Sequence, residues 1–203
     1  MKFFSAKATP FGRTVELVAY ELGIHGELEI VPTTVAPTTE NPGYQALNPL
    51  RKIPALVLDD GTLLTDSGLI TRYLASRVGD SQIFADGSPD HWRVMNDYML
   101  AKGTADCLVA ARYEGAVRPE AARWPAWLAD QLAKAHAVLA YFEKAPPATG
   151  GERLTIAAIG LGAALGYMDF RFPDEGWRGR YPALATWAEP VFSRPSFVAT
   201  RPE

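Results

Sequence analysis

Two short motifs in the first third of the chain carry groups that suit a small charged ligand. Lys52-Ile53-Pro54 stands where a polar loop meets an apolar strand-like run, and Asp66-Ser67 stands directly before an amphipathic run. An X-Pro bond adopts the cis form at a cost of only about 0.5–1 kcal/mol, and a cis Ile53-Pro54 bond would turn the Ile53 amide and carbonyl toward an extended ligand backbone. A trans proline that opens an edge strand fits the same residues.

Asp66-Ser67 has the composition of a helix start. We expect Ser67 to be the N-cap of a helix that begins at Gly68, or to lie in its first turn, where free amide groups and the helix dipole favour an anion. A ligand carboxylate would bind there, while Asp66 would pair with a ligand ammonium. The alternative is that both residues only cap the helix. As a binding pair, they would recognise the amino-acid end of a ligand.

The order of these motifs and of the strands around them resembles the N-terminal, thioredoxin-like domain of the glutathione transferase family. That resemblance implies glutathione as co-substrate. It assigns the cysteinyl backbone of glutathione to Ile53 beside Pro54, the glycine carboxylate to Lys52, and the γ-glutamyl end to Asp66 and Ser67. Asp66 stands where glutamate is more usual in the family, which shortens the side chain and keeps its charge.

Two hydroxyls are candidates for activating the thiol of glutathione. Thr9 precedes Pro10-Phe11 at a predicted helix start, the position of the activating residue in the serine-type and cysteine-type classes of the family. A hydroxyl donor at a helix N-terminus would stabilise the thiolate. The alternative for Thr9 is a simple N-cap. Ser5, at the end of the first predicted strand, is the second candidate, because tyrosine-type members carry their hydroxyl close to that place.

The reaction type follows from the residues near the N-terminus. Positions 5 to 12 contain no cysteine, so a covalent mixed disulfide cannot form there. The family resemblance then implies conjugation of the glutathione thiol to a small hydrophobic electrophile, in a role such as detoxification, or reduction of a peroxide by bound glutathione.

The electrophile is expected between the domains, against the first long helix of the C-terminal half. Its candidate contact residues are Phe11, Tyr98, Lys102 and Tyr113, with Asp106, Arg112 and Tyr167 as further lining residues.

The fold class predicted for the chain is an α/β thioredoxin-like N-terminal domain followed by an all-α helical domain. We place the glutathione-binding domain at residues 1–78, a linker at 79–88 and the helical domain at 89–203. The segment 156–170 is nearly uncharged, which predicts a buried central helix. Thr155 can cap that helix, but Ala158 stands where many family members have the acid of a capping box.

Composition excludes several classes of protein. The chain has 203 residues, 48% of them apolar, a net charge of −3 and one cysteine, Cys107. These values predict a cytoplasmic protein without a disulfide framework and without an affinity for nucleic acid. No apolar run reaches the length of a membrane helix. The histidines His25, His91 and His136 are too scattered to predict a metal site.

The family resemblance also implies a homodimer, with Arg72, Arg77, Trp92 and Arg93 near its surface. Proteins of a different functional class have the same fold but no catalytic activity, and act as binding or protein-interaction modules. The threonine at position 9 and the incomplete capping box favour that alternative, whereas the intact Lys52-Ile53-Pro54 and Asp66-Ser67 motifs favour the enzyme.

Overall fold

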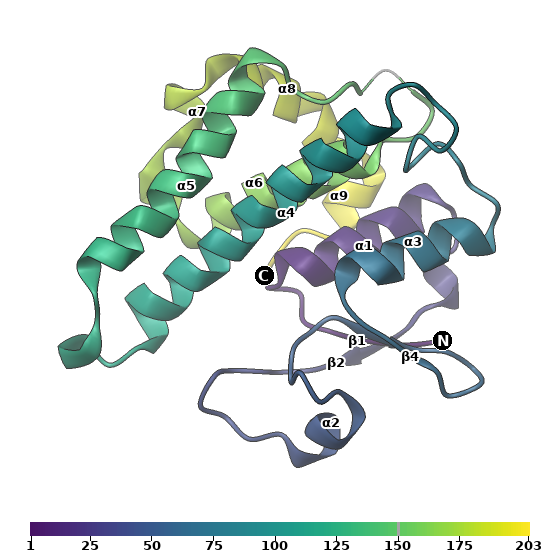
Figure 1. Cartoon of the computed structure of the whole chain (residues 1–203), viewed down its shortest axis with the longest axis horizontal. Coiled ribbons are helices and arrows are strands. Elements are labelled where there is room, and N and C mark those ends of the chain that lie inside the picture. Colours follow the sequence, from purple (N-terminus) through teal and green to yellow (C-terminus); the bar gives the residue numbers. More distant parts are fainter. Residues whose placement is uncertain (150) are drawn as a thin grey trace.

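The computed structural model describes residues 1–149 and 151–203. A small sheet with its helices forms the N-terminal part, and the rest of the described chain is helical (Figure 1). The predicted fold class, a thioredoxin-like α/β region followed by an all-α region, is confirmed.

The N-terminal part contains β1 (Lys2–Ser5), α1 (Pro10–Glu21), β2 (Glu29–Pro32), α2 (Pro42–Leu47), β3 (Ala55–Val57), β4 (Leu63–Leu64) and α3 (Ser67–Arg77). The sheet order is β2-β1-β3-β4, with β1 parallel to β2 and antiparallel to β3, and β4 antiparallel to β3. Helices α1 and α3 cover one face of the sheet, and α2 lies on the other side (Figure 1). The loops after β1 and before β3 therefore open at the same end of the sheet.

The helical part contains α4 (His91–Arg112), α5 (Pro125–Lys144), α6 (Ile156–Arg171), α7 (Trp177–Arg180), α8 (Pro182–Phe192) and α9 (Pro195–Ala199). A π-helical turn, Tyr113–Val117, extends α4, and three single 3-10 turns complete the helices: His25–Glu27, Glu120–Ala122 and Pro173–Glu175. Within the ranges that the structure describes, no helix combines the length and the apolar character that crossing a membrane requires.

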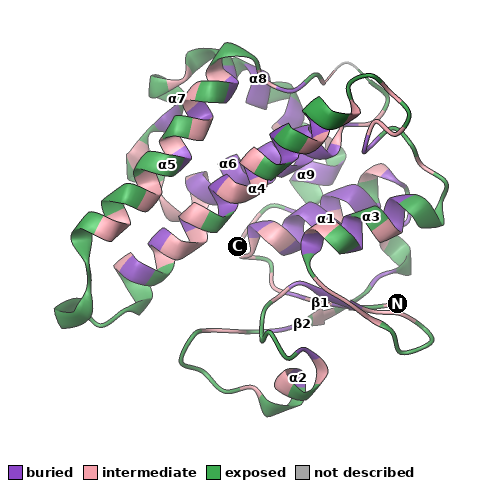
Figure 2. Cartoon of the chain, viewed as in Figure 1, coloured by how far each residue is buried: buried purple, intermediate pink, exposed green. Residues whose placement is uncertain are grey.

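Helix α6 is the centre of the helical part, as its composition predicts. Every residue from Ile156 to Met168 is buried, and the outer faces of α4 and α5 are largely exposed (Figure 2). The Thr155 hydroxyl accepts the Ala158 N–H at 3.4 Å, which confirms the half of the capping box that the sequence retains. The predicted loop at 145–151 includes position 150, which lies outside the described residues.

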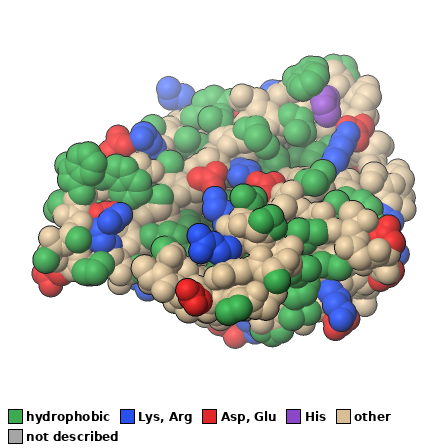
Figure 3. Space-filling model, turned by 60° about the horizontal axis from the view of Figure 1, so that its bottom comes forward, with side chains coloured by type: hydrophobic (Ala, Val, Ile, Leu, Met, Phe, Trp, Pro, Cys, Tyr) green, Lys and Arg blue, Asp and Glu red, His purple; other side chains and the backbone are tan. Residues whose placement is uncertain are grey.

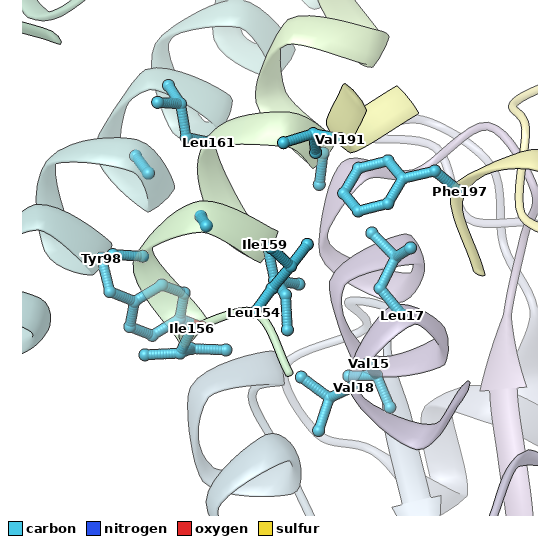
Figure 4. Close-up of a cluster of buried hydrophobic side chains, with 14 of the residues drawn as sticks. Val15, Leu17, Val18, Tyr98, Leu154, Ile156, Ile159, Leu161, Val191 and Phe197 are labelled. Carbon is cyan, nitrogen blue, oxygen red and sulfur yellow. The ribbon is translucent and has the colours of Figure 1, made fainter. Parts of the chain in front are cut away.

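One apolar core joins the two parts. Side chains of α1 lie beside those of α6 and its lead-in segment, and Phe197 of α9 closes the same cluster (Figure 4). The labelled members of this cluster are Val15, Leu17, Val18, Tyr98, Leu154, Ile156, Ile159, Leu161, Val191 and Phe197. Because α6 packs against both α1 and α4, it connects the N-terminal part of the chain with the helical part.

Candidate functional site

A cavity of about 900 Å³ lies between the two parts of the chain. One wall consists of the loops after β1, after β2 and before β3, together with residues of α2 and the starts of α1 and α3. The other consists of α4, its π-helical extension and the end of α6. Figure 3 shows basic and acidic side chains gathered near the middle of one face of the molecule. The motifs that the sequence singles out lie on this cavity.

All five residues predicted to bind glutathione line the cavity: Lys52, Ile53, Pro54, Asp66 and Ser67. The Ile53-Pro54 bond is cis. Neither the N–H nor the C=O of Ile53 has a hydrogen-bond partner among the described residues. Both groups are therefore available to the backbone of a peptide-like ligand.

The loop before Ile53 is held by two side chains that sequence reasoning missed. The Tyr44 hydroxyl donates to the Lys52 carbonyl at 2.5 Å, and the Asn48 amide donates to the same oxygen at 2.7 Å. Asn48 is completely buried. An asparagine directly before Pro49 was the available signal, since a buried amide at a turn usually bonds to nearby backbone.

Asp66, and not Ser67, is the N-cap of α3. One Asp66 carboxylate oxygen accepts the Gly68 N–H at 2.9 Å, and the other lies 3.4 Å from the Lys102 ammonium on α4. Ser67 is the first helical residue and is buried. The free amide end of α3 and an acidic side chain therefore face the same cavity, as an amino-acid head group requires.

The two candidate hydroxyls differ in their surroundings. Thr9 is the N-cap of α1 and lines the cavity, and within residues 1–149 and 151–203 its side chain makes no capping hydrogen bond. Ser5 is 2% exposed, and its hydroxyl lies directly under Gly12 rather than on the cavity wall. The Ser5 hydroxyl has no partner in the described chain. Of the two candidate residues, Thr9 therefore lines the cavity and Ser5 does not.

The cavity lining includes most of the residues that the sequence predicts to contact an electrophile. Phe11, Lys102 and Tyr113 line the cavity, and so do the further lining residues Asp106, Arg112 and Tyr167. The Lys102 ammonium lies 5.4 Å from the centre of the Phe11 ring, close enough for a cation–π contact.

The structure places Tyr98 elsewhere. The residue is 2% exposed, and its ring packs against Gly160 of α6, where it would crowd any added Cβ. Its hydroxyl lies under the first turn of α3, and burial raises the pKa of the phenol to about 12. Tyr98 belongs to the core beneath the site and does not line the cavity.

Arg171, at the end of α6, also lines the cavity and was not expected from the sequence. The nearly uncharged run before Arg171 predicts a helix that is buried along its whole length, but the last turn of this helix reaches the cavity. The arginine at the end of the run is the residue that could have indicated this. Burial raises the pKa of the nearby Tyr167 phenol, and the positive charges of Arg171 and Arg112 act in the opposite direction.

Other reactive side chains lie away from the cavity. In the described parts of the chain, no group of three or more His, Cys, Asp or Glu residues could hold a metal ion. Cys107 is partly exposed on α4 but outside the cavity lining, and burial raises the pKa of its thiol.

Two segments of the chain match models of a known protein family. Residues 8–77 match the family model described as the N-terminal domain of glutathione S-transferase, and residues 125–189 match the model of its C-terminal domain.

Two crystal structures of a glutathione transferase family member from Pseudomonas fluorescens Pf-5 resemble the whole chain. The structure with bound glutathione is 36% identical with a TM-score of 0.94, and the match covers 100% of this chain and 98% of that one. The structure with bound S-(propanoic acid)-glutathione is 35% identical with a TM-score of 0.89, and the match covers 100% of both chains. The uncharacterized GST-like protein YibF of Escherichia coli K12 is 29% identical over 205 residues, which cover 100% of this chain and 98% of YibF.

Proposed function

Because the chain belongs to the glutathione S-transferase family, we propose that it binds glutathione in the cavity and joins the glutathione thiol to a small electrophile. One observation carries the proposal: three groups line one cavity, namely the Ile53 backbone and the Thr9 hydroxyl, which have no hydrogen-bond partner among the described residues, and the carboxylate of Asp66 at the start of α3. Glutathione offers one complementary group to each of them, namely a peptide backbone, an ammonium and a thiol.

In the proposed complex, glutathione lies extended along residues 52–54. The Ile53 N–H and C=O pair with its cysteinyl backbone, and Lys52 attracts the glycine carboxylate. Asp66 accepts hydrogen bonds from the ammonium of the γ-glutamyl end, while the first turn of α3, with Ser67, donates to the carboxylate beside that ammonium.

Thr9 is proposed to stabilise the thiolate. Its hydroxyl donates a hydrogen bond to the sulfur at the N-terminus of α1, where the helix dipole also favours negative charge. The thiol proton leaves to solvent. The sulfur then attacks the electrophile held between Phe11, Lys102 and Tyr113, a carbon–sulfur bond forms, and a leaving group departs with its electron pair. With an organic peroxide, the thiolate would attack the terminal oxygen, the O–O bond would break, and the alkoxide would leave and take a proton from solvent. A second glutathione would then convert the sulfenic acid formed on the first into glutathione disulfide and water.

Two further proposals concern the context of this activity. The family resemblance suggests a homodimer, and Trp92, with 78% of its surface exposed, is a large apolar side chain that a second copy could cover. A cytoplasmic role in detoxification fits a chain with a single cysteine. Light scattering in dilute solution tests the dimer, because a mass of one chain would contradict it.

The enzyme proposal is tested by retention on immobilised glutathione together with turnover of 1-chloro-2,4-dinitrobenzene. Both are expected. If the protein is retained on glutathione but turns over neither this electrophile nor cumene hydroperoxide, the result would indicate a carrier instead of an enzyme. Failure of both retention and turnover would support the interaction-module alternative.

A further inference from the structure

Two arginines at the C-terminal ends of neighbouring helices of the helical part line the cavity. Arg112 is the last residue of α4, and Arg171 is the last residue of α6. The two helices pack side by side, and Tyr98 near the start of α4 contacts Gly160 near the start of α6. The helices are therefore parallel, and their C-terminal ends bring both guanidinium groups to the same wall.

Neither guanidinium is neutralised by the part of the chain that the structure describes. Within residues 1–149 and 151–203, neither arginine forms an ion pair, and the Arg171 Nε is buried without a hydrogen-bond partner. The recorded contact of the Arg171 guanidinium is a cation–π contact with the Phe170 ring, 3.9 Å from its centre, which leaves the charge without a counter-ion. By contrast, the third cation of this wall, Lys102, lies 3.4 Å from both Asp66 and Asp106. A buried guanidinium donor without an acceptor is costly, so it is expected to gain from an anionic ligand.

The excess of basic side chains in the cavity lining also favours an anionic ligand. Its lining has five basic side chains, Arg51, Lys52, Lys102, Arg112 and Arg171, against two acidic ones, Asp66 and Asp106. The complete chain, however, is negatively charged. Glutathione itself brings two carboxylates and one ammonium. Arg51 and Lys52 lie at its proposed glycine end, which leaves the arginines of α4 and α6 without an assigned counter-charge.

A cation in the last turn of a helix also interacts favourably with the helix dipole, which is the simplest alternative explanation for each arginine alone. Lys144, in the last turn of α5, is an example that is exposed and lies outside the cavity. The dipole accounts for a basic residue at each helix end, but not for two unpaired arginines on one cavity wall.

Other residues of the cavity lining define the rest of the ligand. Phe11, Val109, Ala110 and Val117 offer apolar contacts, and Tyr113 and Tyr167 offer phenol groups. This combination suits a short apolar or aromatic body that ends in a carboxylate.

We propose that the electrophile of this protein carries a carboxylate, and that Arg112 and Arg171 bind it while the electrophilic carbon faces the glutathione sulfur. The inference rests on the proposed function and names its substrate class. The relative solved with bound S-(propanoic acid)-glutathione holds a conjugate of this chemical kind. With an α,β-unsaturated acid, the thiolate sulfur forms a bond to the β-carbon as the C=C π bond breaks. The displaced electron pair takes a proton from solvent at the α-carbon, and nothing leaves.

The test compares two conjugates that differ only at the end of the side arm, S-(2-carboxyethyl)glutathione and S-propylglutathione. Isothermal titration calorimetry is expected to show that the full chain binds the acid about tenfold more tightly than the propyl conjugate. The preference should fall toward one in Arg112→Gln and in Arg171→Gln, and stay unchanged in Lys144→Gln. Arg171→Lys, which keeps the charge but loses the Nε donor, should retain part of the preference and guards against a folding defect in the glutamine variant.

The outcomes separate the two proposals. Equal affinities of the wild-type protein for the two conjugates, or a preference that survives both arginine-to-glutamine changes, would overturn the carboxylate subsite and leave glutathione binding standing. Failure of glutathione and of both conjugates to bind would overturn the proposed function and the subsite together.

Discussion

The ammonium of Lys102 lies 3.4 Å from the carboxylate of Asp66, so a side chain of the helical domain contacts the acid at the start of α3. The side chain of Asp66 is 57% exposed, and its second oxygen remains on the Gly68 N–H. An exposed ion pair of this kind contributes little to stability. It does, however, place a competing cation beside the group proposed to hold the ammonium of glutathione.

This arrangement predicts that substitutions of Asp66 and of Lys102 change the affinity for glutathione in opposite directions. Asp66→Asn should weaken glutathione binding about 10–100-fold, because a charge-assisted hydrogen bond is lost, while asparagine still caps α3. Lys102→Met should tighten binding by about two- to threefold, because the competing ammonium is gone. Calorimetric titration with glutathione measures both. Weaker binding in Lys102→Met would mean that this lysine contacts glutathione directly.

Thr9→Ala should lower kcat for 1-chloro-2,4-dinitrobenzene about 100-fold, because the sulfur loses its hydrogen-bond donor, and should change the Kd of glutathione by less than about threefold. Thr9→Ser restores the hydroxyl and is expected to keep kcat within about tenfold of the wild type. Full activity in the alanine variant would transfer the role to a backbone amide, since the Ser5 hydroxyl lies under Gly12.

The stability of the turn that carries Tyr113 should depend on pH through the carboxyl group of Glu114. The Trp124 N–H lowers the pKa of this buried carboxyl, and Arg118 adds to the effect. Because the folded state lowers the pKa, the stabilisation is present above the ordinary value of 4.5 and is lost as the pH falls through the lower folded value.

Thermal melts of Glu114→Gln and of the wild type should therefore differ most near neutral pH and converge in acid below pH 4.5. Glu120→Gln provides the matched control, because Glu120 is exposed and its Tm difference from the wild type should stay small at every pH. A Tm difference for Glu114→Gln that stays constant from pH 7 to acid would contradict the assignment.

Gly166 should not tolerate a side chain, because the Arg13 guanidinium fills the space that a Cβ would need. Gly166→Ala is expected to cost about 1–3 kcal/mol of folding free energy. Gly103, on α4, has no atom near the corresponding position, so Gly103→Ala should stabilise the protein by about 0.4–1 kcal/mol. Urea unfolding of the two variants measures the contrast, and equal shifts would mean that Arg13 moves aside without cost.

The sequence predicted the fold class and the positions that line the glutathione side of the cavity, because their signals are local. A proline at a strand entry and an acid before a helix each act within a few residues. The structure brings Lys52, Ile53, Asp66, Ser67 and Thr9 together, although their roles toward glutathione remain proposals.

The electrophile side was harder to predict, because its boundary depends on what packs against each helix. Tyr98 and Lys102 are one turn apart on the same face of α4, but the first turn of α3 covers Tyr98 and leaves Lys102 open. For Ser5 the signal was available: alternate residues of a strand share a face, and Ser5 therefore follows Phe3 into the core.

Arg13 lies one helical turn beyond Thr9, and its buried guanidinium donates to the Phe197 carbonyl and the Thr200 hydroxyl. Burial lowers the pKa of this guanidinium to about 10. The helix that presents Thr9 is thus anchored from behind by α9 and the residue that follows it. If Thr9 stabilises the thiolate as proposed, a substitution in α9 would consequently shift the acidity of the sulfur by tilting the Thr9 hydroxyl.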